Sequence, residues 1–262
     1  MGSPLRYRIV TWDEVVELSE RLARKVERSG YRPDTVISLT RGGWVPARIV
    51  SDILDVHNLY SIRVEYYKGS VHGKRAVVTH SLPVNINGKR VLMVDDISHT
   101  GSSLRAVCAH LLRRFRPAEF RIAALHVVEG TKVMPDYYVG FSPASRPTWF
   151  IYPWHFWEDA RRLVGEILRE RPGVSLRELR RELRRRHGLK TDSVSDERLR
   201  AVAADARLLI GGESSLLSSR HSRCARPRGG TAHRRSPSTR ASSPPPCRCA
   251  SARGGRTRRA AP

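Results

Sequence analysis

The stretch Val91-Leu-Met-Val-Asp-Asp-Ile-Ser-His-Thr-Gly-Ser-Ser-Leu104 decides the fold class of this chain. An apolar strand pattern ends in two adjacent aspartates, a short loop of small and hydroxyl residues follows, and a helical pattern runs from Leu104 towards Leu112. A strand that leads through a short loop into a helix is the repeating unit of α/β folds. Ligands of such folds bind at the carboxyl ends of the strands, which is where these polar residues lie.

The sequence on both sides of this stretch alternates strand and helix patterns in the same way. Thr11 and Glu14 form a capping box at the start of one helix. Val45, Ile49 and Ile53 have the spacing of an apolar helix face. Strand patterns occur at residues 34–39, 61–67, 90–94, 120–128 and 137–139. This alternation predicts an α/β fold with a mostly parallel sheet flanked by helices.

The composition excludes several classes of protein. The chain has 262 residues, a hydrophobic fraction of 40% and a formal net charge of +23, so it can build a core and is not wholly disordered. No apolar run approaches the roughly 20 residues that a membrane helix needs. Met1 to Val10 lacks the apolar segment of a secretory signal, and four Cys in such a long chain do not indicate a disulfide framework. We therefore expect a cytoplasmic protein with no membrane partner.

Charge and aromatic content divide the chain into three parts. Residues 1–157 hold all 18 aromatic residues and the strand patterns, and we predict one domain there. Residues 158–210 are charged and helical in pattern, with a capping box at Ser175 and Glu178, and they predict a C-terminal appendage of three helices. Residues 211–262 carry 12 Arg, one acid and many Ser, Pro and Gly. They cannot bury enough apolar surface to offset chain entropy, so we predict a disordered basic tail.

The Arg-rich helices of residues 158–210 allow two interpretations. A helix–turn–helix reader of DNA would use Arg177, Arg180, Arg181 and Arg184 to Arg186 against phosphates. Arg-rich faces are more often solvated helix surface. We therefore favour an appendage and do not expect a nucleic-acid partner.

The loop after the two aspartates has the chemistry of a site for a phosphorylated sugar. Backbone N–H groups at a helix start, together with small hydroxyl residues, form an anion cradle, and Gly101 lets the backbone approach the ligand closely. The small and hydroxyl residues that form this cradle are Thr100, Gly101, Ser102 and Ser103. Asp95 and Asp96 beside it could grip the 2′- and 3′-hydroxyls of a ribose, directly or through Mg²⁺.

At these residues the chain resembles the type I phosphoribosyltransferases. The resemblance implies that Asp95 and Asp96 contact the ribose hydroxyls of phosphoribosyl pyrophosphate (PRPP), and that the 5′-phosphate lies on Ser98 to Ser103. It implies Mg²⁺, bound mainly through PRPP, as the cofactor, with Asp95 and Asp96 as candidate ligands. A homodimer is also expected by resemblance. His99 could relay a proton at the base or only fill space beside the cradle.

Three further segments are similar to the purine-salvage branch, namely bacterial xanthine-guanine phosphoribosyltransferases and their archaeal relatives, including adenine enzymes of the same scaffold. The segments are residues 7–13 with 38–46, residues 65–68, and residues 148–154. The resemblance implies that Thr40, Arg41, Gly42 and Gly43 bind pyrophosphate, which suits an Arg clamp beside open backbone donors. A loop that closes over PRPP in the family follows Tyr67 and Lys68, which are further pyrophosphate candidates. Trp149 would stack on the base, and Phe150 would offer backbone groups to its edge.

Two departures from the family pattern bear on the choice of base. His99 stands where 6-oxopurine enzymes usually have an Asp for N7, and the stretch after the next strand has no Lys before Lys132 to contact the exocyclic oxygen. Because hydrogen-bond mismatch at a base edge discriminates strongly, we predict adenine as the substrate, converted with PRPP to AMP and pyrophosphate. The alternatives are a 6-oxopurine enzyme and a PRPP-sensing transcriptional regulator of the same fold.

Overall fold

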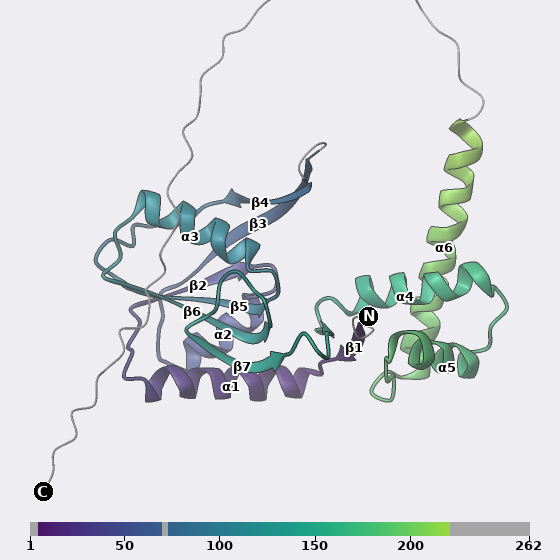
Figure 1. Ribbon diagram of the computed structural model, residues 1–262, viewed down its shortest axis with the longest axis horizontal. Helices are drawn as coiled ribbons and strands as arrows, with labels where there is room; N and C mark the ends of the chain where they lie inside the picture. The colour runs from purple at the N-terminus through teal and green to yellow at the C-terminus, as the bar shows by residue number, and fades with distance from the viewer. Residues whose placement is uncertain (1–4, 70–72, 221–262) are drawn as a thin grey trace, which may run out of the picture. The chain divides into compact units, whose positions relative to one another are not determined.

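The structure is a computed structural model that describes residues 5–69 and 73–220, with only the backbone described for 66–69, 73–75 and 211–220 (Figure 1). Its main sheet has six strands in the order β4-β3-β2-β5-β6-β7. All neighbours are parallel except β3 and β4. The strands are β2 (Thr35–Thr40), β3 (Leu59–Gly69), β4 (Gly73–His80), β5 (Arg90–Ser98), β6 (Glu119–Val128) and β7 (Tyr137–Ser142). The predicted α/β fold with a mostly parallel sheet is confirmed.

Helices cover the two faces of this sheet separately. Helices α1 (Trp12–Arg28) and α2 (Trp44–Ile53) pack on one face, and α3 (Ser102–Arg114) packs on the other (Figure 1). Neighbouring residues of β5 serve different faces, since Leu92 belongs to the core under α1 and Met93 to the core under α3. The strands are therefore apolar on both sides, as expected of a buried parallel sheet.

The connections reverse direction between β2 and β5. From β2 the chain passes through α2 to β3 on one side, and from β5 it passes through α3 to β6 on the other. The carboxyl ends of these two adjacent strands thus form the topological switch point of the sheet, where ligands of open α/β folds bind.

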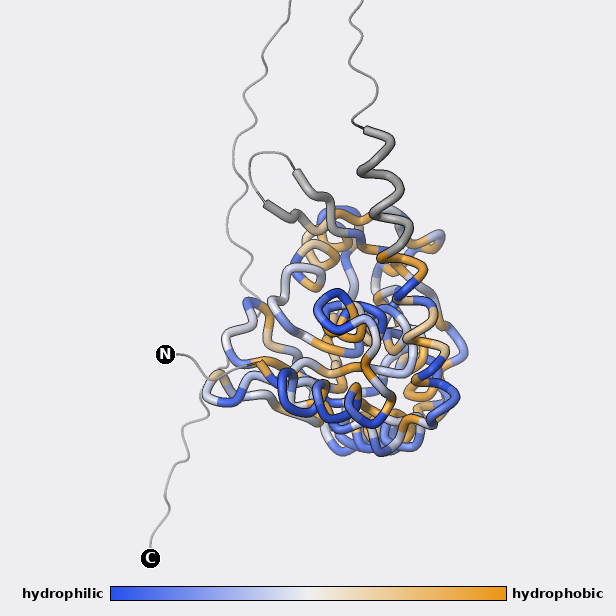
Figure 2. Tube along the Cα trace, turned by 90° about the vertical axis from the view of Figure 1, so that its right-hand side faces the viewer, coloured by the Kyte–Doolittle hydropathy of each residue, from blue (hydrophilic) through white to orange (hydrophobic). Residues whose placement is uncertain are grey.

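The helical part has a core of its own that includes two short strands. Strands β1 (Arg6–Ile9) and β8 (Thr148–Ile151) form a parallel pair. Ile9 and Ile151 pack with helices α4 (Phe156–Glu170), α5 (Leu176–His187) and α6 (Asp196–Arg220). Hydrophilic and hydrophobic residues are intermixed along the coloured part of the trace in the view turned by 90° (Figure 2). The contacts group Met1–Ser222 as one compact unit, so the division at residue 157 remains a proposal.

One helix runs past a predicted boundary of the chain's parts. Helix α6 extends to Arg220 and so includes the first ten residues, 211–220, of the predicted tail. Once a helix is nucleated, each added residue gains a backbone hydrogen bond, so Gly211 and Gly212 do not end it. Residues 221–262, the rest of the predicted tail, lie outside the described residues. No helix in the described part is long and apolar enough to span a membrane.

Candidate active site

The two aspartates lie at the carboxyl end of β5 and are buried. Asp95 is 6% exposed and Asp96 is 4% exposed. The backbone N–H of Asp96 donates to Oδ1 of Asp95 at 2.9 Å. Nε1 of Trp154 donates to Oδ2 of Asp96 at 2.9 Å, and the hydroxyl of Tyr152 donates to the Asp96 carbonyl at 2.9 Å. Asp96 is therefore held by an aromatic segment that follows β8.

Burial changes the acidity of both carboxyl groups. Loss of water raises the pKa of Asp95 well above its ordinary value, and the neighbouring charge of Asp96 raises it further. Burial also raises the pKa of Asp96, while the Trp154 hydrogen bond opposes that rise. Burial of two adjacent carboxylates costs free energy unless a cation offsets their charge. Buried acids with such perturbed pKa values are concentrated at functional sites.

The predicted pyrophosphate loop lies directly on the acid pair. A Cβ added at Gly42 would lie 2.2 Å from Oδ2 of Asp96, and one at Gly43 would lie 2.4 Å from the carbonyl oxygen of Val94. Both positions therefore require Gly. The Thr40–Arg41 peptide bond is cis. Because β2 and β5 are neighbours in the sheet, their carboxyl ends bring this loop and the aspartates together.

The side chains of this loop have different environments. Thr40 is buried, and its hydroxyl donates to the carbonyl of Ile62 at 3.1 Å. Arg41 is exposed, and Nη2 lies 3.7 Å from Oε2 of Glu158 in α4. Tyr67 and Lys68 lie in β3, but their side chains fall outside the described residues. Arg41 is therefore the cationic side chain of this loop that the structure describes. An incoming pyrophosphate could replace Glu158 as its partner.

The predicted phosphate cradle forms the start of α3. Gly101 is the N-cap with φ of +71°, and a Cβ there would lie 2.6 Å from the backbone nitrogen of Val133. The Thr100 hydroxyl accepts from the backbone N–H of Ser102 at 3.3 Å and donates to the Ser102 hydroxyl at 3.0 Å. His99 and Thr100 are exposed, and Ser102 and Ser103 are half-buried. The N-terminus of α3 thus offers backbone N–H groups to an anion.

The side chain of Ser98 does not point to the cradle. It is 1% exposed, and its hydroxyl hydrogen-bonds to the Val133 carbonyl at 2.9 Å and the Thr131 hydroxyl at 2.8 Å. The backbone N–H of Lys132 donates to the Thr100 carbonyl at 3.1 Å. The loop at residues 131–133 therefore supports the cradle. The sequence did not predict this supporting role. Its one related feature is Lys132, which comes later after the preceding strand than the Lys of the family pattern.

The two predicted base-binding residues point to different places. Trp149 is 38% exposed, and its ring meets that of His99 with centroids 5.7 Å apart and planes at 63°. Phe150 stacks on His126 with centroids 3.9 Å apart. His126 also hydrogen-bonds to the Tyr152 hydroxyl at 2.7 Å. Burial, followed by the nearby charge of Arg8, lowers the pKa of His126 to about 4, so it is neutral at physiological pH.

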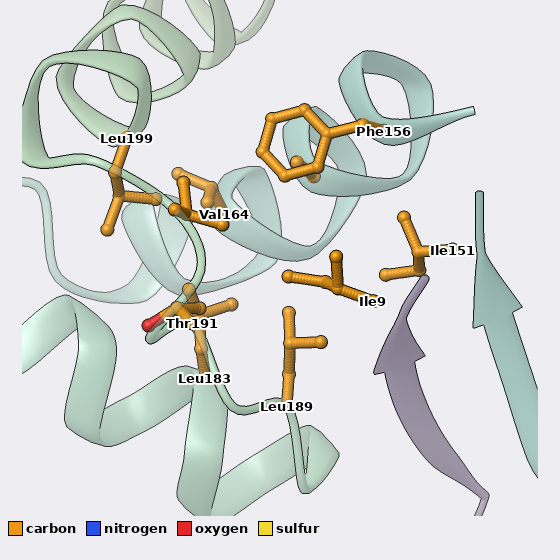
Figure 3. Close-up of a pocket in the computed structure, with 10 residues that line it drawn as sticks. Ile9, Ile151, Phe156, Val164, Leu183, Leu189, Thr191 and Leu199 are labelled. Atoms are coloured by element: carbon orange, nitrogen blue, oxygen red, sulfur yellow. The ribbon is translucent and has the colours of Figure 1, made fainter. Parts of the chain in front are cut away.

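The helical core contains a small apolar cavity that is separate from these groups. Its volume is about 10 Å³. The close-up shows the side chains of Ile9, Ile151, Phe156 and Leu189 around it (Figure 3). An apolar space of that size holds at most about one water molecule and has no group to orient a ligand. The cavity is therefore a small gap in the packing of the helical core. The candidate site is the edge of the main sheet formed by Asp95, Asp96, the loop after β2 and the cradle.

Comparisons with known proteins match this region of the chain. Residues 8–160 match the family model described as the phosphoribosyl transferase domain. A xanthine-guanine phosphoribosyltransferase of Cereibacter sphaeroides is 30% identical over 151 residues, which cover 55% of this chain and 84% of the relative. One from Nitratidesulfovibrio vulgaris is 27% identical over 158 residues, covering 59% of this chain and 90% of the relative. The crystal structure of a purine phosphoribosyltransferase from Pyrococcus horikoshii is 35% identical, covers 56% of this chain and 93% of that one, and has a TM-score of 0.50.

Proposed function

Because the chain belongs to the phosphoribosyl transferase domain family, we propose that it is a purine-salvage enzyme that transfers the phosphoribosyl group of PRPP to a 6-oxopurine. The products are the purine nucleotide and pyrophosphate. The observation that carries the proposal is the packing of the Arg-Gly-Gly loop on Asp96, beside the cradle at the start of α3. This arrangement gathers groups for pyrophosphate, ribose and 5′-phosphate at one edge of the sheet.

The relatives favour a 6-oxopurine over the predicted adenine. Their names are those of xanthine-guanine enzymes, so the proposal takes the alternative that the sequence left open. The adenine prediction rested on His99 and on the lack of an early Lys. The loop with Lys132 nevertheless lies against Thr100 of the cradle, so a lysine is carried next to the site in spite of its late position in the sequence.

Each group of the site has a part in the proposed reaction. Backbone N–H groups at the start of α3 bind the 5′-phosphate, and Asp95 and Asp96 hold the ribose hydroxyls. Arg41 exchanges Glu158 for the departing pyrophosphate and stabilises its charge. Trp149 stacks on the base. His99, which contacts the Trp149 ring, is the candidate to accept a proton from the base, because a neutral imidazole has one ring nitrogen that accepts.

Mg²⁺ is the proposed cofactor. Carboxylate oxygens are the ligands that this ion prefers, and Asp95 and Asp96 supply them in a pair whose burial a cation would offset. In the described part of the chain no group of three or more His, Cys, Asp or Glu could hold a metal, so we propose that PRPP supplies most of the ligands. The ion would neutralise charge on pyrophosphate as the bond to the sugar breaks.

Steady-state rates with xanthine, guanine, hypoxanthine and adenine in the presence of PRPP and Mg²⁺ test the proposal. We expect an oxopurine to give the highest kcat/KM, and a clear preference for adenine would reinstate the earlier prediction. Pyrophosphate release separates the enzyme from a PRPP-sensing regulator, because a regulator would bind DNA without turnover. The homodimer and the cytoplasmic location also remain proposals, and sedimentation velocity tests the first.

A further inference from the structure

The first turn of helix α4 holds the indole of Trp149. Oδ2 of Asp159, in this turn, accepts a hydrogen bond from Nε1 of Trp149 at 3.0 Å. The Asp159 side chain is only 10% exposed. An indole has a single hydrogen-bond donor, and a carboxylate is a strong acceptor. The bond therefore satisfies the single hydrogen-bond donor of the Trp149 side chain and fixes the direction of its ring.

A second residue of α4 holds Asp159 itself. Nη2 of Arg162 lies 3.5 Å from Oδ1 of Asp159 and 3.4 Å from the hydroxyl of Tyr7. Nη1 of Arg162 lies 3.2 Å from Oε1 of Glu166. Tyr7 is the register partner of Trp149 in the β1–β8 pair. Carboxylate, guanidinium and phenol thus connect α4 to both strands beside the Trp149 ring.

The Trp149 ring needs such an anchor because much of it is open to solvent. The residue is 38% exposed, and in the part of the chain that the structure describes its ring packs on one other ring, the edge contact with His99. An exposed side chain changes rotamer readily when nothing holds it. Stacking on a planar base requires a defined ring plane. If the ring plane is already fixed before the base binds, binding does not lose free energy to the ordering of the Trp149 side chain.

We propose that Asp159 is a positioning residue that orients Trp149 for stacking on the purine base. The inference rests on the proposed function, because the base is the ligand that the function assigns to Trp149. Asp159 touches no substrate and acts through the indole N–H. The proposal gives the helical part a role at the base site, since α4 is its first helix.

Kinetics of Asp159 variants test this role. Asp159→Ala removes the acceptor, so the KM for the base should rise about tenfold, the effect of losing one hydrogen bond to a charged group. The kcat and the KM for PRPP should stay within about twofold of wild type, because the ribose and pyrophosphate groups are untouched. Asp159→Asn keeps an oxygen acceptor and should recover most of the loss. Glu166→Gln is the matched control, because Glu166 contacts Arg162 on the same helix.

A double-mutant cycle shows whether Asp159 acts through the indole. Trp149→Phe keeps an aromatic ring and lacks the N–H group. In that background Asp159→Ala should change the KM for the base by less than about twofold, because the interaction is already absent. An equal rise in both backgrounds would overturn the proposal. If Asp159→Ala does not fold, Asp159→Glu displaces the acceptor instead, and a wild-type KM for the base in that variant would count against the proposal.

The indole N–H resonance of Trp149 reports the hydrogen bond without turnover. Its assignment follows from its loss in Trp149→Phe. The resonance should shift and exchange faster with solvent in Asp159→Ala, and stay in place in Glu166→Gln. An unchanged resonance in Asp159→Ala would refute the geometry. If the wild type converts no purine with PRPP, the proposed function is wrong. If the wild type is active but Asp159→Ala leaves the KM for the base unchanged, only this inference is wrong.

Discussion

Substitution of Gly42 by Ala tests whether the pyrophosphate loop must lie directly on Asp96. A Cβ at Gly42 would lie 2.2 Å from Oδ2 and 2.5 Å from Cγ of Asp96. Real Cβ atoms essentially never come within 3.0 Å of another heavy atom, so one partner must move by about 0.8 Å. The carboxylate is held because its Oδ2 also accepts the indole N–H of Trp154 at 2.9 Å. We therefore expect the loop at residues 40–43 to lift away from β5.

The size of the effect follows from this displacement. Overpacking of a close-packed site costs about 1–3 kcal/mol. For a compact unit of this size, that cost lowers the melting temperature by about 2–12 °C. Misplacement of a binding group by about 1 Å can reduce the rate about 100-fold, so kcat/KM for PRPP should fall by about two orders of magnitude. The KM for the base should change far less, because the loop carries the pyrophosphate clamp.

Gly173→Ala provides the matched control. A Cβ at Gly173 would meet no heavy atom within 4 Å, and its φ is not in the left-handed region. The control should keep full activity and equal or slightly higher stability, because Ala restricts the unfolded chain. The assay is nucleotide formation over a series of PRPP concentrations, together with differential scanning calorimetry. A Gly42→Ala protein that matches the control in kcat/KM for PRPP and in melting temperature would refute the reasoning.

Three further predictions concern charge and packing. The folded protein binds a proton at Asp95 more tightly than the unfolded chain does, because the pKa of Asp95 is raised. The stability that Asp95 contributes is therefore greatest below about pH 4 and falls as the pH rises through the raised pKa. Urea titrations over this range should show a flatter pH dependence for Asp95→Asn than for wild type, and equal slopes would contradict the prediction. Glu158→Gln frees Arg41, so the KM for PRPP should fall by up to about fivefold in initial-rate measurements, and a higher KM would oppose this. Leu183→Ala removes a side chain that is 1% exposed in the helical core and should cost about 2–5 kcal/mol by urea unfolding. Arg184→Ala, on the exposed neighbour, should stay within about 0.5 kcal/mol of wild type, and similar losses in both would refute the packing argument.

Local patterns predicted much of the fold because they depend on neighbouring residues. Both capping boxes, Thr11 with Glu14 and Ser175 with Glu178, are present as predicted. The strand, loop and helix around the aspartates also form as predicted, although β5 extends to Ser98. Helix α6 runs past residue 211 because helix propagation does not depend on the composition that marked the tail, and the division at residue 211 remains a proposal.

The candidate site was predicted in part. The sheet logic placed the pyrophosphate loop and the aspartates at one edge, and the structure brings Gly42 and Asp96 into contact. The burial of the acids was not predicted, because the indole of Trp154 comes from 58 residues further along the chain. The inward turn of Ser98 was missed for the same reason, since its partner is the carbonyl of Val133. The substrate roles of these residues remain predictions.

The sequence by itself determined the fold class, the strands β2, β3, β5, β6 and β7 with the helices between them, and the chemical types at the site, because periodicity, caps and a strand that ends in two carboxylates are local features. It did not indicate the strands β1, β4 and β8. Only the tertiary structure decided which of these groups meet. It placed Gly42 on Asp96, turned Phe150 onto His126, and joined Trp149 to Asp159. These contacts join separate strands and helices whose approach depends on how the cores pack, and no local pattern specifies that approach.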